Sequence, residues 1–474
     1  MTLSFDARPA APAPTQAPRG LARWRPAARG ALAGAALLGA LLQGCGARGQ
    51  PRTAGELAQE AQRQLSQGHA AEARAGFDAA LDRDPRLLAA VRGRVEASRR
   101  LGRLPEVLTE AQARVATSQT DGVAWYQLGL ALFARGDEAG AVAALRRAAD
   151  LLPQQADAHY RLGVALFDGE KFAEARAPLA RAVELEPRSA RYRVPLATCL
   201  DRLGEHKAAL AHLAQVPALS PTPDEAALAV LAARTLTDPF RGLAPEARQG
   251  LELALGYLLK DAPGLAVPVL DALREKLPDL GAAHALLGLA AQRLDEAGRA
   301  VSELKRAAEL SPESPQPHAW LGELYASKDK PELAVQEYRL ALERNPLEVP
   351  SLRKLGLLLL GTAGGAGSAL GPLRAAAALE PSDATLAVLV ARTELQLPAE
   401  AARGRARLEA LAEERPEDPE VLLRLAQALS DQRAQASDSE RATLARRASV
   451  LAEKVLLLQP GNALASRILS QTRQ

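Results

Sequence analysis

The side chains that most often bind metals or act as acids and bases are sparse in this chain of 474 residues, which has six histidines and two cysteines. His284 and His318 lie 34 residues apart, and His159 holds the corresponding position in an earlier segment. That spacing places the rings in separate structural repeats, too far apart to share one metal ion. His206 and His212 are six residues apart and do not share a helical face. The histidines therefore predict no metal site.

Nucleophiles and phosphate-binding loops are equally poorly supported. The run Gly364-Gly365-Ala366-Gly367-Ser368 is rich in glycine, but the Gly-Lys-Ser/Thr of a phosphate loop does not follow it. Ser368 also lacks the flanking glycines of a hydrolase elbow. Cys199 has no histidine base beside it and is expected to be a small buried apolar residue. Carboxylates such as Glu413 and Asp418 are expected at solvated helix ends. We therefore expect no catalytic residue, cofactor or small-molecule substrate, and a protein that is not an enzyme.

The composition favours helices and argues against one class of partner. The chain is 48% hydrophobic but only 3% aromatic, and alanine and leucine dominate its apolar residues. The formal net charge is +3, but the first 44 residues hold five arginines and one aspartate, so the remainder is near −1. A nearly neutral body lacks the long-range attraction that nucleic-acid binding requires. No nucleic acid is expected as a partner.

The N-terminus has the pattern of an export signal. The apolar run Ala31–Leu42 follows arginines and is too short to span a bilayer. It ends in Leu42-Gln43-Gly44-Cys45, which resembles the bacterial lipobox. The resemblance implies that Cys45 is lipidated and becomes the N-terminus, with acyl chains that anchor it stably to a membrane. The alternative is an ordinary thiol beside an apolar stretch. The stretch before the apolar run is long and rich in proline, and a start further downstream, for example at Leu21, would give a normal basic leader.

The residue after Cys45 bears on which membrane carries the anchor. Lipoproteins with an aspartate at this place tend to stay in the inner membrane, and this chain has Gly46 there. The resemblance therefore implies an outer-membrane lipoprotein that faces the periplasm.

A period of 34 residues organises the rest of the chain. It relates two sets of prolines: Pro153, Pro187 and Pro221, and Pro278, Pro312 and Pro346. In the same phase, a leucine is followed by a small residue and later by an alanine and a larger apolar residue, as in Leu128, Gly129, Ala141 and Leu145. A small residue lets two helices approach closely where they cross, and proline ends the second helix. Because one pair cannot bury its apolar face alone, the pairs must stack.

This pattern resembles the tetratricopeptide repeat. The signature is carried by Trp125-x-x-Leu128-Gly129-x-x-Leu132, followed by Ala141, Leu145, Ala148 and Pro153. Residues 156–189, 281–314 and 315–348 match about as well, 54–87 matches in its second half, and 88–121 is degenerate. The resemblance implies an all-α fold, a right-handed superhelical solenoid of antiparallel helix pairs in one or two sub-arrays. It also implies that the histidines occupy a position where the family has a large packing residue such as Trp125.

The interruptions of the period predict the domain organisation. Pro221 and Pro278 are further apart than one period by 23 residues, so an extra segment lies between them, with a helix at Asp224–Leu236 and a break at Thr237–Gly242. Loops are expected at Gly361–Gly371 and Ser430–Ser439. The predicted parts are a signal peptide (1–44), a tether (45–53), an N-terminal array (54–223), an inserted helix and linker (224–246), and a C-terminal array with a capping helix from Ala463 (247–474).

The resemblance also implies a binding surface. In this family the first helix of each pair lines a concave groove. By the family's phase, the groove residues are Tyr126, Leu130, Phe133, Tyr160, Val164, Phe167, Arg191, Val194 and Arg202. An apolar groove with a basic edge suits an amphipathic helix or an extended segment of a protein partner. The alternative is that these side chains pack against neighbouring helices. The corresponding wall of the second half, Ala285, Leu289, Ala319 and Glu323, is blander and expected to be structural.

Two functions remain open for such an array. The first is a lipid-anchored, periplasm-facing scaffold that binds a protein partner and assists assembly of an envelope, pilus or secretion complex. The second is a regulatory or targeting subunit of an enzyme that acts on peptidoglycan or polysaccharide. The sequence names neither the partner nor the oligomeric state.

Overall fold

A computed structural model describes residues 52–433 and 436–472 of the chain. The described residues form 24 α-helices and one short 3₁₀ helix, η1, and contain no strand. The chain divides into two compact units, one ending at Leu185 and the other beginning at Glu186. The all-α array of helix pairs is thereby confirmed. The predicted boundary at 224–246 lies inside the second unit and stays a prediction.

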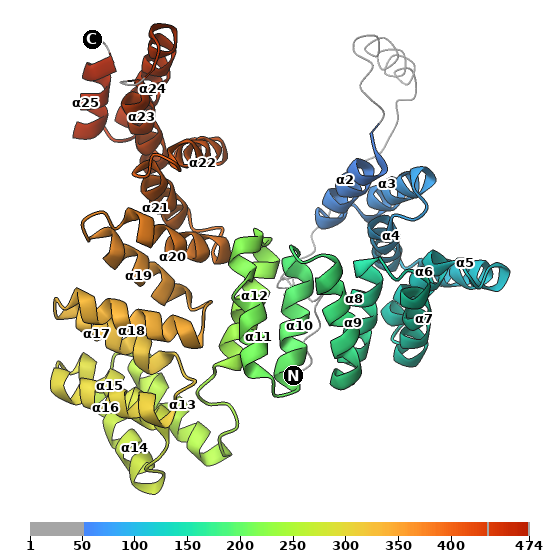
Figure 1. The fold of residues 1–474 in the computed structure, drawn as a ribbon, viewed down its shortest axis with the longest axis horizontal. Coiled ribbons are helices and arrows are strands. Elements are labelled where there is room, and N and C mark those ends of the chain that lie inside the picture. The colour runs from blue at the N-terminus through green and yellow to red at the C-terminus, as the bar shows by residue number, and fades with distance from the viewer. Residues whose placement is uncertain (1–51, 434–435, 473–474) are drawn as a thin grey trace, which may run out of the picture. The chain divides into compact units, whose positions relative to one another are not determined.

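The first unit contains four helix pairs (Figure 1). They are α2 (Ala54–Ser66) with α3 (Ala70–Arg83), α4 (Leu88–Arg100) with α5 (Leu104–Thr117), α6 (Gly122–Arg135) with α7 (Glu138–Leu151), and α8 (Ala156–Asp168) with α9 (Phe172–Leu185). The segment 88–121, which keeps little of the sequence signature, still forms the complete pair α4 and α5.

The second unit begins with α10 (Ala190–Arg202), the short α11 (His206–Leu213), η1 (Val216–Leu219) and α12 (Pro223–Leu236). Six pairs and one single helix follow. They are α13 (Pro245–Leu259) with α14 (Pro263–Lys276), α15 (Gly281–Arg293) with α16 (Ala297–Leu310), α17 (Gln316–Ser327) with α18 (Pro331–Arg344), α19 (Val349–Leu360) with α20 (Ala366–Leu379), α21 (Ala384–Leu395) with α22 (Ala401–Glu414), α23 (Pro419–Arg433) with α24 (Asp438–Leu458), and the last helix α25 (Ala463–Thr472).

Close approach of the two helices in a pair depends on glycine, as the period predicts. A Cβ atom added at Gly129 of α6 would lie 2.6 Å from Cγ of Leu145 on α7, and one added at Gly288 of α15 would lie 2.5 Å from Cγ of Leu304 on α16. Real Cβ atoms do not approach carbon atoms so closely, so each glycine is matched to one leucine of its partner helix.

The extra helix predicted between Pro221 and Pro278 is present as α12, and the short η1 comes just before Pro221. Thr222 begins α12 with a capping box, in which its hydroxyl accepts from the backbone N–H of Glu225 at 3.3 Å and its own N–H donates to the Glu225 carboxylate at 2.9 Å. Both η1 and α12 pack against α20, although the seven helices α13 to α19 lie between them in sequence (Figure 1). The second unit is therefore not a simple stack of successive neighbours.

Two predicted loops are shorter than expected. The loop expected at Gly361–Gly371 ends at Gly365, since α20 begins at Ala366 and includes Gly367 and Gly371. The loop expected at Ser430–Ser439 lies between Arg433, the end of α23, and Asp438, the start of α24. The expected capping helix is present as α25.

Candidate functional site

The predicted groove residues of the first unit lie on α6 and α8, the first helices of their pairs, but most of them have little exposed surface. Phe133 is partly exposed. The other five, Tyr126, Leu130, Tyr160, Val164 and Phe167, are buried. Their periodic spacing reflects a packed interior at least as much as an open wall, which is the alternative that the sequence left open. Their role in partner binding stays a prediction.

Tyr126 shows what such a residue does in the interior. Its side chain is 0% exposed, and its hydroxyl donates a hydrogen bond to Oδ2 of Asp157 at the start of α8. The other oxygen of Asp157 lies 3.0 Å from Nη1 of Arg92 on α4. Burial, reinforced by the neighbouring carboxylate, raises the pKa of Tyr126, so the hydroxyl stays protonated and can donate. This network links three first helices through one carboxylate.

The predicted track continues on α10, in the second unit. Val194 is buried, Arg191 is partly exposed with its guanidinium 5.5 Å from the centre of the Tyr192 ring, and Arg202 is exposed. The two parts of the track thus belong to different compact units. A continuous groove through both stays a prediction.

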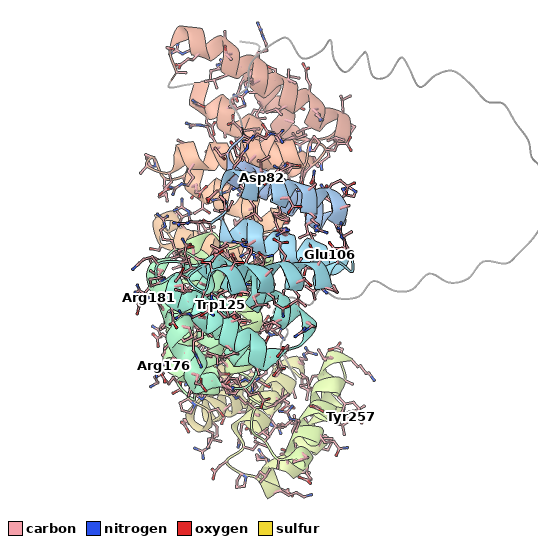
Figure 2. All side chains as sticks on the ribbon, turned by 90° about the vertical axis from the view of Figure 1, so that its right-hand side faces the viewer. Asp82, Glu106, Trp125, Arg176, Arg181 and Tyr257 are labelled. Carbon is pink, nitrogen blue, oxygen red and sulfur yellow. The ribbon has the colours of Figure 1, made fainter. Side chains whose placement is uncertain are left out.

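The histidine position of the repeats has a structural role that the sequence did not reveal. In four repeats, the side chain at this position hydrogen-bonds to the backbone carbonyl six residues earlier: Trp125 Nε1 to Gln119 at 3.0 Å, His159 Nε2 to Pro153 at 3.1 Å, Arg193 Nη2 to Pro187 at 2.5 Å, and His284 Nε2 to Pro278 at 3.1 Å. Trp125 is labelled in Figure 2. An indole, an imidazole and a guanidinium can all supply the N–H, so the position requires a long side chain with a donor. Each of these bonds ties the turn between two repeats to the next first helix.

No catalytic or metal centre is visible in residues 52–433 and 436–472. Among these residues, no group of three or more His, Cys, Asp and Glu side chains could hold a metal ion. Cys199 is buried, in agreement with the sequence. Cys45, the predicted lipidation site, lies outside the described residues. In the part of the chain that the structure describes, no helix is both long and apolar enough to cross a bilayer.

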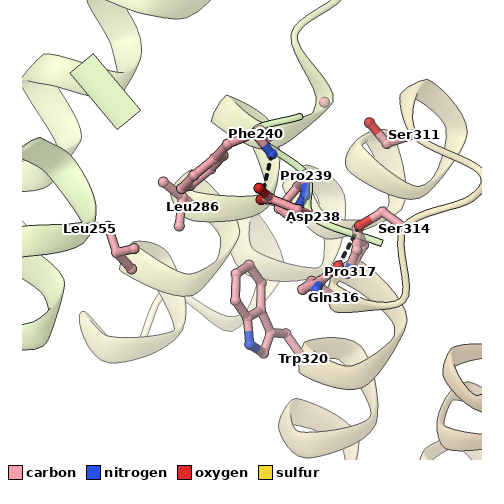
Figure 3. Close-up of a pocket in the computed structure, with 13 residues that line it drawn as sticks. Asp238, Pro239, Phe240, Leu255, Leu286, Ser311, Ser314, Gln316, Pro317 and Trp320 are labelled. Atoms are coloured by element: carbon pink, nitrogen blue, oxygen red, sulfur yellow. Dashed lines mark hydrogen bonds between the residues drawn. The ribbon is translucent and has the colours of Figure 1, made fainter. Parts of the chain in front are cut away.

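The site that sequence reasoning missed is a pocket in the second unit, of about 180 Å³ (Figure 3). Three first helices contribute to it: α13 through Leu255, α15 through Ala285 and Leu286, and α17 through Pro317 and Trp320. It therefore lies on the wall that the sequence marks as structural. The remaining side is formed by Asp238, Pro239 and Phe240, from the segment that connects α12 to α13, and by Gly281, Ala282, Ser311, Ser314 and Gln316.

The polar groups around the pocket are largely paired with each other. The hydroxyl of Ser314 donates to Oε1 of Gln316 at 2.7 Å, and Oδ1 of Asp238 accepts from the backbone N–H of Phe240 at 3.0 Å. The pocket is therefore lined mainly by apolar side chains, among them Phe240, Leu286 and Trp320, which Figure 3 shows around one hollow. An apolar cavity with few polar groups suits the side chain of a bound segment.

Two features of the sequence could have indicated this pocket. Aromatic residues make up only 3% of the chain, so Phe240 and Trp320 are conspicuous in its second half. Phe240 also lies in a break between helices, where no packing partner within its own repeat is available. What the sequence could not show is that this break returns to α15 and α17.

Comparisons with known proteins agree with the repeat pattern. A family model described as TPR repeat matches residues 129–169, and one described as Tetratricopeptide repeat matches residues 160–224 and 286–349. No curated protein matches the chain significantly. Similar solved structures include the APC/C hetero-tetramer Cut9–Hcn1 (13% identity, 90% of this chain and 97% of that chain, TM-score 0.34). Yeast Tom70 is also similar (13% identity, 88% and 99%, TM-score 0.31), as is PilF of Pseudomonas aeruginosa (21% identity, 48% and 98%, TM-score 0.36).

The family matches fall on both compact units and coincide with helix pairs that have the period and the close glycine contacts of this repeat. Such repeats present stacked first helices to protein partners. The chain is thus an all-α array of helix pairs in which models of the tetratricopeptide repeat match residues 129–224 and 286–349.

Proposed function

We propose that this protein is a non-catalytic scaffold, anchored to the outer membrane through a lipid on Cys45 and facing the periplasm. It binds a protein partner and assists assembly of an envelope, pilus or secretion complex. The anchor and location are inferred from the apolar run and the sequence Leu42-Gln43-Gly44-Cys45. The binding role is inferred from the repeats.

The observation that carries the binding role is the pocket of the second unit. Leu286 and Trp320 line it from first helices, the elements on which such arrays bind partners. Trp is also the residue type most enriched among the energetically dominant residues of interfaces, because it buries a large area in few rotamers. A partner would place an apolar side chain in the pocket, and its backbone or polar side chains would form hydrogen bonds with polar residues at the rim.

The experiment is a cross-linked affinity purification of the full-length protein from bacterial membranes, with captured proteins identified by mass spectrometry. We expect one protein to be captured by the wild type and reduced at least tenfold with Trp320→Ala. The matched control is Leu265→Ala on α14, because Leu265 is exposed and lies outside the pocket. Equal capture by wild type, Trp320→Ala and Leu265→Ala would contradict the pocket as the binding site. An enzyme of peptidoglycan or polysaccharide metabolism recovered in equal amount would point to a regulatory subunit instead of a scaffold.

The anchor is tested separately. Labelling of growing cells with a radioactive or clickable fatty acid should mark the wild-type protein and not the Cys45→Ala variant. That variant should also leave the membrane fraction. Labelling that survives Cys45→Ala would rule out this cysteine as the lipidation site, and the absence of label from both proteins would rule out the lipid anchor.

A further inference from the structure

The segment Thr237–Leu243, here called the strap, runs from the end of α12 to just before α13 without forming a helix. It starts beside the turn between α18 and α19, where Nδ2 of the buried Asn345 lies 3.5 Å from Oγ1 of Thr237. Its middle then passes α17 and α15, whose residues face Asp238–Phe240 across the pocket (Figure 3). The strap thus crosses three successive repeats in the direction opposite to their order in the chain.

The strap is held by its backbone and by three of its side chains. The carbonyl oxygen of Phe240 accepts from Nη2 of Arg248 on α13 at 2.7 Å. The ring of Phe240 and the side chain of Leu243 pack against the apolar cluster of α13, α14 and α15. Nη1 of Arg241 lies 2.7 Å from Oδ1 of Asp201 on α10. Main-chain hydrogen bonds and buried side chains are also what hold a bound extended peptide on a protein surface, but here the segment is part of the same chain.

The strap covers the wall formed by α13, α15 and α17 only in part. The turn in which Asp238 accepts from the N–H of Phe240 directs the Phe240 ring toward Leu286, and the pocket remains open between this ring and Trp320. The hollow of about 180 Å³ that remains shows that the strap leaves part of the wall uncovered. A segment with a second large apolar group could contact both the α15 and the α17 side of the hollow.

From these observations we propose that the strap is an intramolecular ligand that competes with the partner for the wall of α13, α15 and α17. The strap also indicates the chemistry of that partner: an extended segment with proline followed by an aromatic residue, as in Pro239-Phe240. This inference rests on the proposed function, since it assigns the partner's chemistry and the regulation of the same pocket. Displacement of the strap would break the ion pair between Arg241 and Asp201. Binding in the pocket would thereby change the contacts of α10, on which Asp201 lies.

The test measures binding of a fluorescent peptide with the sequence of residues 236–244, Leu-Thr-Asp-Pro-Phe-Arg-Gly-Leu-Ala, to the full-length protein in detergent. The strap-release variant is Phe240→Ala with Arg241→Ala. A tethered competitor acts at an effective concentration of about millimolar, so release should strengthen peptide binding by roughly tenfold or more. Adding Trp320→Ala to the release variant should abolish the gain, and a control peptide with alanine in place of phenylalanine should not bind either protein.

A second variant keeps the test valid if strap release disturbs folding. Asp201→Asn leaves Phe240 and Arg241 intact and neutralises the carboxylate that pairs with Arg241 and His206, so peptide binding should be intermediate between wild type and release variant. Equal peptide binding to wild type, Asp201→Asn and a folded release variant would overturn the inference. Peptide binding that is unchanged by Trp320→Ala would also overturn it. Dependence of partner capture on Trp320 without any effect of strap release would leave the proposed function standing and reject the strap as a competitor. If the peptide binds as expected but no partner is captured, the strap would stand as a ligand of the wall and the proposed function would be rejected.

Discussion

Nη1 of Arg241 lies 2.7 Å from Oδ1 of Asp201, so an ion pair fastens the strap to helix α10. The Asp201 side chain is 8% exposed and also lies 2.8 Å from Nδ1 of His206, whereas the Arg241 side chain is 40% exposed. The buried carboxylate is therefore the fixed partner, and the arginine is the one that can leave when the strap moves.

Asp201→Asn should loosen the strap without removing any side chain from it. Loss of the charged partner should lower the free energy of unfolding by about 1–2 kcal/mol, because a half-exposed ion pair is partly screened by water. Limited trypsin digestion should cut after Arg241 several times faster than in the wild type. Glu252→Gln is the control, since Glu252 is an exposed carboxylate on α13. Equal cleavage rates in wild type and Asp201→Asn would show that the ion pair does not hold the strap.

Tyr126→Phe should destabilise the first unit. The change removes only the hydroxyl, and it leaves one oxygen of the buried Asp157 carboxylate without its donor, which should cost about 1–2 kcal/mol in the free energy of unfolding. Chemical denaturation of the full-length protein, monitored by circular dichroism, measures this change in the free energy of unfolding. If Tyr126 instead contacted a partner, partner capture would fall while stability stayed the same.

Gly288→Val and Gly298→Ala should change stability in opposite directions. A side chain at Gly288 meets Cγ of Leu304 at 2.5 Å, and overpacking of this kind costs about 1–3 kcal/mol. Gly298, on the neighbouring helix α16, has open space around its Cα, so alanine there should add up to about 1 kcal/mol through helix propensity. Thermal melts of both variants against the wild type give the comparison. A melting temperature unchanged by Gly288→Val would contradict the close approach of α15 and α16.

His284→Ala should be costly although no metal is involved. Nε2 of His284 donates to the carbonyl oxygen of Pro278 at 3.1 Å, and Nδ1 lies 2.6 Å from Oε2 of Glu303. Loss of both bonds at a buried position should reduce the free energy of unfolding by roughly 2–3 kcal/mol. His159→Ala should cost less, because His159 is more exposed and only its bond to Pro153 is broken. Zinc or a chelator should shift none of these melting temperatures; a shift that disappears in His284→Ala would identify a metal site.

His212 should make the second unit less stable in mild acid. Burial, with a contribution from the charge of Arg193, lowers the pKa of His212 below its ordinary value of 6.5. The unfolded chain therefore binds a proton at a higher pH than the folded chain does, so stability is complete above 6.5 and is lost as the pH falls below it. The free energy of unfolding should decline from pH 7.5 to pH 5 less steeply in His212→Leu than in the wild type. Identical pH profiles would mean that the ring is solvated in solution.

Much of the fold could be predicted from the sequence because each helix pair repeats the same spacing of small and large apolar residues. The spacing of Leu128, Gly129, Ala141 and Leu145 defines a helix crossing, and the close contact of Gly129 with Leu145 has the geometry that this spacing requires. The helix Asp224–Leu236 was also predictable, since it carries its own start signal at Thr222 and Glu225.

The functional surface was less predictable because it depends on contacts distant in sequence. The phase of the repeat identifies the face of the helix on which Tyr126 lies, but not that its hydroxyl donates to Asp157, which also pairs with Arg92. The pocket was even harder to predict, because Phe240 lies outside the repeat period. It lines the same cavity as Trp320 only because the strap crosses the array. Periodicity describes what is common to all repeats, whereas this site arises where the period is interrupted.

The packing of η1 and α12 on α20 joins two parts of the second unit that are separated by everything from the strap to the start of α20. A repeat array whose members touch only their successors can lose terminal repeats one at a time. Here, the intervening chain forms a closed loop, and its closure entropy must be overcome before the contact forms. Folding of this part should therefore be slower than that of a linear stack of the same length, and its unfolding more cooperative. Truncation before α20 would expose the apolar face of α12 rather than merely shorten the array.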